Sequence, residues 1–64
     1  MDRLREYMTN RGLTQAELAA LLGVSQPTVS DWLNGNALPS TKKLLKISKK
    51  IGLSVDELLK GAPH

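Results

Sequence analysis

The stretch "GLTQAELAALLGVSQPTVSDWLNG", residues 12–35, decides the fold. It holds two runs of apolar side chains at helical spacing, and Gly23 divides them. Thr14 and Glu17 form the pattern of a capping box, and Ser25 can cap a second helix through its hydroxyl. Glycine is favoured just past a helix end because that position often needs a positive φ. We therefore predict two short helices joined by a turn at Gly23.

The same signals recur along the rest of the chain. Ser40 can cap another helix, and Ser54 with Glu57 repeats the capping-box pattern. Strand signals are weak, since aromatic residues make up 3% of the sequence and apolar residues show no sustained alternation. The predicted fold class is all-α, a compact five-helix domain with helices at about 2–10, 15–22, 26–34, 41–51 and 55–60. We expect residues 1–60 to form this domain and residues 61–64 to be a flexible C-terminal tail.

Helical periodicity also predicts the hydrophobic core. The expected core residues on the helices are Leu4, Met8, Leu18, Ala19, Leu22, Val29, Trp32, Leu44, Ile47, Ser48, Ile51, Leu58 and Leu59. Four more apolar residues lie beside the turns and are expected to close the ends of the core: Leu13, Val24, Leu38 and Leu53. Such a small core leaves little room for an internal ligand cavity.

Length and composition exclude several classes of protein. A chain of 64 residues forms one domain and buries only about 60% of the surface that its unfolded form exposes. No apolar stretch approaches the roughly 18 residues needed to span a bilayer. The absence of cysteine rules out disulfides and thiolate metal sites and fits a cytoplasmic protein.

Catalytic signals are also missing. The sequence contains no nucleophile–base pair with an orienting group, no glycine-rich phosphate loop and no metal-ligand spacing. His64 is a lone terminal histidine, to which we assign no metal. We predict no enzymatic activity, no cofactor, no metal and no small-molecule ligand.

Positive charge gathers on the helix expected at 41–51. Its five lysines, Lys42, Lys43, Lys46, Lys49 and Lys50, span an arc of roughly 120° at 3.6 residues per turn. No acidic residue lies between Gly35 and Val55, and the net charge of the chain is +3. A lysine arc is also typical of a solvated helix face, so alone it does not indicate a nucleic-acid partner.

Residues 15–34 have the spacing of a helix-turn-helix unit, with small Ala19 at the expected crossing and a second helix free to enter a major groove. From about Gly12 to Leu59 the chain resembles the lambda-repressor-like (Cro/repressor, or XRE-type) helix-turn-helix family. The matching features are the "LTQAELA" entry, the Gly23 turn, the "WLNG" exit and the terminal "GLSVDELL".

The resemblance implies a DNA site, transferred position by position. Gln15 matches a phosphate-binding glutamine, and Ser25 is a helix cap that can also contact phosphate. The groove-facing residues correspond to Gln26, Pro27, Thr28 and Asp31, with Ser30 on the flank. Asn34, Asn36, Lys42 and Lys43 correspond to the region that approaches phosphates. Arg3 and Arg11 are further candidates for phosphate contacts. Lys49 and Lys50 are expected to lie too far from the DNA for contact and to contribute only to the positive electrostatic field.

The chemistry of the groove-facing residues refines this prediction. Gln26 can pair with adenine N6 and N7, and Pro27 can contact a thymine methyl. A proline at the second helical position costs little, because the first turn has no intrahelical acceptor for its N–H groups. Asp31 departs from the family preference. It accepts from cytosine N4 and helps to exclude wrong sites, or it lies at the solvent edge and contacts nothing.

The predicted function is a sequence-specific regulator of transcription that binds double-stranded DNA, of the phage Cro-like or small bacterial repressor kind. One domain makes few contacts, so we expect a homodimer, at least on DNA, on a pseudo-palindromic operator in the cytoplasm. The alternative is a protein-interaction or antitoxin-type module on the same fold. Asp31 and the absence of basic residues on the third helix motivate that alternative.

Overall fold

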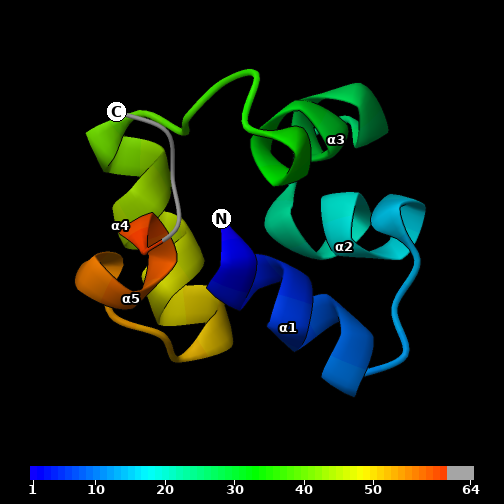
Figure 1. The fold of residues 1–64 in the computed structure, drawn as a ribbon, viewed down its shortest axis with the longest axis horizontal. Coiled ribbons are helices and arrows are strands. Elements are labelled where there is room, and N and C mark those ends of the chain that lie inside the picture. The colour runs from blue at the N-terminus through cyan, green and yellow to red at the C-terminus, as the bar shows by residue number, and fades with distance from the viewer. Residues whose placement is uncertain (61–64) are drawn as a thin grey trace.

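The computed structural model describes residues 1–60, which form five α-helices and no strand. The helices are α1 (Asp2–Asn10), α2 (Gln15–Leu22), α3 (Gln26–Asn34), α4 (Thr41–Ile51) and α5 (Val55–Leu59), as Figure 1 shows. The predicted all-α class and the helix bounds are confirmed, except that α5 ends one residue early. The predicted tail at 61–64, with Gly61 and His64, lies outside the described residues. No helix within residues 1–60 is long and apolar enough to cross a membrane.

Side-chain caps set where α2, α3, α4 and α5 begin. Ser25, Ser40 and Ser54 each accept a hydrogen bond from a backbone N–H in the first turn that follows. The box predicted at Thr14 is complete, because Thr14 Oγ1 accepts from the Glu17 N–H at 3.1 Å and Glu17 Oε1 accepts from the Thr14 N–H at 3.0 Å. These bonds satisfy donors that have no partner within the helix.

Replacing Thr14 with alanine tests this cap. We expect the free energy of unfolding to fall by about 1 kcal/mol, because the Glu17 N–H loses its acceptor. Thr14→Ser keeps the hydroxyl and is the matched control. Urea unfolding followed by circular dichroism measures both variants. Equal stability of the alanine and serine variants would contradict a role for the hydroxyl.

The core lies where all five helices meet. Its buried hydrophobic residues are Met1, Leu4, Leu18, Ala19, Val29, Trp32, Leu33, Leu44, Ile47 and Leu58. Eight of these ten were predicted. Ala19 is 3% exposed. Its carbonyl accepts a hydrogen bond from the N–H of Val24 at 3.0 Å, and this bond turns the chain back toward α2. Gly23, at φ +72°, makes this reversal in the left-handed region, and the reversal sets α3 against α2.

Two predicted core residues are exposed. Leu59 is 39% exposed because neighbours on a helix point about 100° apart, and Leu58 takes the inward position on short α5. Leu38 is 44% exposed, while the adjacent Pro39 is buried in its place. Met8, Leu22, Ile51, Leu13, Val24 and Leu53 are partly buried and pack against the core, and Ser48 is half-buried.

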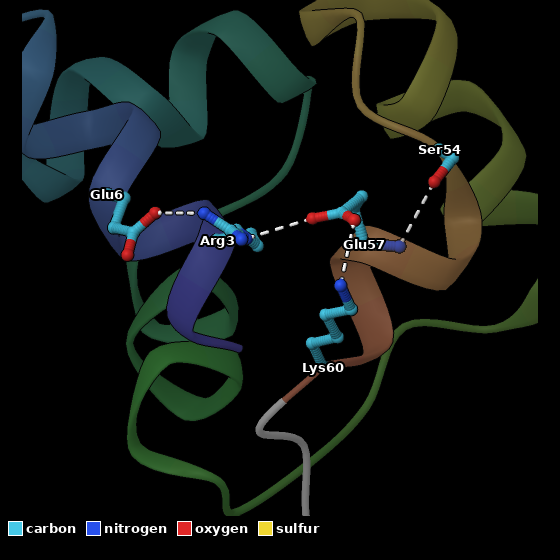
Figure 2. A network of polar contacts seen from close by, with 5 residues as sticks. All are labelled: Arg3, Glu6, Ser54, Glu57 and Lys60. Atoms are coloured by element: carbon cyan, nitrogen blue, oxygen red, sulfur yellow. Dashed lines mark hydrogen bonds and ion pairs between the residues drawn. The ribbon is translucent and has the colours of Figure 1, made fainter.

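A polar network ties the first helix to the last (Figure 2). Arg3 bonds Glu6 Oε2 and Glu57 Oε2, both at 2.9 Å, and Lys60 Nζ bonds Glu57 Oε1 at 3.0 Å. The Glu57 N–H still donates to Ser54 Oγ at 3.1 Å. The carboxylate of Glu57 is thus directed to Arg3 and Lys60, so the second predicted capping box is only half formed.

This network predicts acid sensitivity. Lys60 and, more weakly, Arg3 hold the pKa of the Glu57 carboxyl below its ordinary value of 4.5. A carboxyl with a lowered folded-state pKa contributes stability that is present above pH 4.5 and is lost as the pH falls through the folded pKa. Glu57→Gln is therefore expected to be less stable than the wild-type chain at pH 7 and to match it near pH 2.

The control for Glu57→Gln is Asp56→Asn, which removes a carboxylate from the same first turn of α5 without touching the ion pairs. Urea unfolding midpoints at several pH values measure the effect. If the two variants showed the same dependence on pH, the helix dipole rather than the ion pairs would be its source.

Candidate nucleic-acid interface

Helix α3 has one buried and one exposed face. Val29, Trp32 and Leu33 are buried in the core, so Trp32 is a core residue as predicted. The opposite arc, about 140° wide at 100° per residue, carries Gln26, Pro27, Ser30, Asp31 and Asn34. All of these are exposed except Ser30, which is half-buried. The helix thus presents a polar surface held rigidly by its apolar side.

The first turn of α3 is fixed by its cap. Ser25 Oγ accepts from the Thr28 N–H at 3.3 Å and shares a hydrogen bond of 2.8 Å with Thr28 Oγ1. Pro27 lies in this turn, where a missing N–H breaks no helical bond. The half-buried Thr28 is turned toward Ser25, whereas Gln26 beside it is exposed. Gln26 and Pro27 therefore form the leading edge of the helix.

The second half of the exposed arc contains an internal hydrogen bond. Asn34 Nδ2 donates to Ser30 Oγ at 3.3 Å, one helical turn away. Asp31 lies beside this pair, and its carbonyl accepts the N–H of Asn36 at 2.9 Å, which closes the helix with Gly35 in the left-handed region. The side chain of Asn36 is exposed just beyond the helix end.

The remaining predicted residues lie on other elements. Half-buried Gln15 begins α2, directly after the capping box. Lys42 is exposed and Lys43 half-buried in the first turn of α4. Residues 35–40 separate this turn from α3, and the start of α4 and α3 lie on the same side of the molecule in Figure 1. The structure therefore gathers the predicted base-reading residues on α3 and leaves the predicted lysines on a neighbouring element.

Three arginines have defined partners. Arg3 is paired with Glu6 and Glu57, and its role as a phosphate contact stays a prediction. Arg11 lies over the Tyr7 ring, 4.9 Å from its centroid. Arg5, which the sequence did not single out, donates to the Leu33 carbonyl at 2.9 Å.

The Arg5 bond anchors the end of α3 to α1. A cation is favourable at this end of a helix because the last carbonyls carry partial negative charge. No local pattern indicates the bond, since its partners are 28 residues apart. Within residues 1–60, no three histidine, cysteine or acidic side chains gather as a metal site would require.

Comparison with known families decides the classification. The helix-turn-helix family matches residues 4–58, which include all of α2, α3 and α4. The chain belongs to the helix-turn-helix family. Two phage repressors among its relatives confirm the Cro/repressor type that the sequence resembles. The family consists of transcriptional regulators, which agrees with the prediction that the chain is not an enzyme.

Several relatives of this helix-turn-helix domain are transcriptional regulators by name. It is 38% identical over 60 residues to the transcriptional activator BcrR of Enterococcus faecalis, covering 94% of this chain and 29% of that one. Repressor protein CI of Enterobacteria phage phi80 is also 38% identical over 60 residues, covering 94% and 25%. A regulator of Methanocaldococcus jannaschii, MJ0272, is 35% identical over 57 residues, covering 89% and 86%.

The domain spans only part of most of these relatives. Its share of the first six relatives ranges from 25% to 56% of their length. The similarity therefore covers a helix-turn-helix domain common to proteins of different size, two of which are named for opposite effects on transcription.

Proposed function

We propose that this helix-turn-helix domain binds a specific sequence of double-stranded DNA and serves in a regulator of transcription. The observation that carries the proposal is the exposed polar arc of α3, whose opposite face is locked in the core by Val29, Trp32 and Leu33. A helix supported in this way fits the major groove, which is about 12 Å wide.

The base-reading residues are Gln26, Pro27 and Asp31. Gln26 at the leading edge pairs with adenine N6 and N7, and Pro27 packs on a thymine methyl. Asp31 accepts from cytosine N4 and disfavours other bases by leaving its charge unpaired. Thr28 and Ser30 flank these contacts, with their hydroxyls oriented by Ser25 and Asn34.

Positive charge comes from a different element. Lys42 and Lys43, in the first turn of α4, contact phosphates beside the groove. Further polar contacts to the backbone come from residues at helix ends: Gln15, Ser25, Asn34 and Asn36. This division explains how a recognition helix without lysine or arginine can serve its purpose, because phosphate contacts position a protein while base contacts specify its sequence.

The DNA-bound form is a homodimer on a pseudo-palindromic operator, and its effect is repression in the cytoplasm. Leu45 and Leu59, which are 51% and 39% exposed on the packed pair α4 and α5, offer apolar area for the second copy. Occupation of an operator blocks transcription without any other activity. The names of the phage repressors among the relatives support this direction.

Selection of bound sequences from random duplex DNA tests the proposal. The expected result is an enriched sequence with two related half-sites, about 10 base pairs apart between centres. Enrichment of a single half-site would support base reading without the dimer. Failure to enrich any sequence at moderate salt would overturn the specific regulator.

Removing the charges of Lys42 and Lys43 tests the proposed phosphate contacts. Lys42→Gln/Lys43→Gln is expected to weaken binding to all sequences alike. In a dimer it removes up to about four phosphate contacts, so the slope of log K against log salt becomes shallower by about 3–4. The matched control Lys49→Gln/Lys50→Gln lowers the charge equally at the far end of α4. An equal change of slope in the control would contradict phosphate contacts at Lys42 and Lys43.

A second candidate function is a protein-interaction or antitoxin-type module. The observation that favours it is the exposed arc of α3, which carries Asp31 and no basic residue. Such a module without DNA binding would show no steep dependence of DNA affinity on salt. An antitoxin-type module would still enrich a DNA sequence, and a bound partner protein would distinguish it.

A further inference from the structure

A groove between α2 and α4 is not explained by the DNA contacts proposed above. It has a volume of about 580 Å³ and is lined by residues 20–22 of α2, by Gly23 just after that helix, and by Lys46, Ile47, Lys49 and Lys50 of α4. Its floor is apolar, because Leu21, Leu22 and Ile47 contribute aliphatic carbons. Leu21 is 36% exposed, whereas Ile47 is buried.

The rim of this groove is strongly positive. Lys46, Lys49 and Lys50 are all exposed. Within residues 1–60, the cations that form ion pairs are Arg3 and Lys60, so none of these three lysines is in an ion pair. The carboxyl ends of α2 and α4 lie here, and each carries about half a negative charge. These two ends offset roughly one of the three lysine charges, so about two positive charges remain without a partner.

We infer that the groove between α2 and α4 is a docking site for an acidic, amphipathic helical segment of a partner protein. Apolar side chains of that segment pack on Leu21 and Leu22, and its carboxylates pair with the lysine rim. Lys46 lies three and four residues from Lys49 and Lys50, so the rim has helical spacing. Carboxylates one turn apart on a partner helix, about 5.4 Å along its axis, match this spacing.

Other ligands fit the groove less well. DNA phosphates are charged and would make no favourable contact with the apolar floor. Lys49 also lies about 10 Å along α4 from Lys42, which is in the proposed DNA surface. A small molecule needs most of its surface covered, whereas only two helices line this groove. A partner segment leaves its outer face in water and uses both the floor and the rim.

Titration of the ¹⁵N-labelled 64-residue chain with a designed helical peptide tests the inference. The peptide carries leucines on one face and glutamates beside them, and a second peptide has glutamine in place of every glutamate. We expect the acidic peptide to shift the amide signals of residues 20–23 and 46–50. The glutamine peptide is expected to bind about tenfold more weakly and with little dependence on salt.

Variants locate the binding site. Leu21→Ser is expected to weaken acidic-peptide binding about tenfold, and Leu38→Ser, which alters an exposed leucine outside both the groove and the proposed dimer surface, is expected to leave it unchanged. Circular dichroism checks that both variants fold. Equal binding of the two peptides, equal effects of the two variants, or no shift at millimolar peptide would overturn the inference. Shifts at residues 46–50 on adding random duplex DNA, as large as those on α3, would assign the rim to DNA instead.

Discussion

Leu18→Ala is expected to remove a large part of the free energy of unfolding at 25 °C. Leu18 is 0% exposed and lies on α2, next to buried Ala19. Truncating a buried leucine costs about 2–5 kcal/mol, because the lost burial is added to the energy of the cavity left behind. A domain of this size has only roughly 3–10 kcal/mol of stability in total. One side chain therefore accounts for a large part of it.

Two controls separate this cavity from other effects of substitution. Leu18→Met keeps most of the volume and is expected to cost less than about 1.5 kcal/mol. Leu45→Ala makes the same truncation at a position that is 51% exposed, and about 1 kcal/mol is expected. Urea unfolding of all three variants measures the differences. If Leu18→Ala were no less stable than Leu45→Ala, Leu18 would not belong to the core that supports α3.

Helix boundaries were predictable because their causes are local. Thr14 and Ser25 bond N–H groups three residues away, and Gly23 adopts a positive φ next to the helix that it ends. The residues involved are close in sequence, so a pattern of a few letters contains the information. The exposed arc of α3 follows in the same way from the period of a helix once its buried face is known.

Contacts between distant segments were not predictable. Leu58 and Leu59 have equal hydrophobicity, and only the packing of α5 decides which of them is buried. Arg3 is one of several basic residues in the sequence, and its ion pair with Glu57 depends on that residue being brought beside α1 by the fold. Helical spacing does favour Leu33, which lies four residues after Val29, whereas buried Met1 has no sequence signal because it precedes the first helix.

Gln26→Ala is expected to abolish much of the preference for the selected DNA sequence while leaving non-specific binding intact. Gln26 is exposed at the leading edge of α3, and an amide that pairs with an adenine edge contributes about 1–3 kcal/mol of discrimination. The corresponding loss of specific affinity is roughly 5- to 150-fold for each half-site. Gln15→Ala, at a proposed phosphate contact, should instead weaken binding to every sequence by the same factor.

A modified base makes this prediction sharper. Replacing the relevant adenine with 7-deazaadenine removes the N7 acceptor and leaves the rest of the duplex unchanged. The wild-type domain should bind the modified operator more weakly than the ordinary one. Gln26→Ala should bind the two operators equally, because it has no amide to bond N7 in either of them. Fluorescence anisotropy at fixed salt measures the four affinities. If the two losses simply added, Gln26 and that adenine would act independently, and the proposed position of α3 in the groove would be wrong.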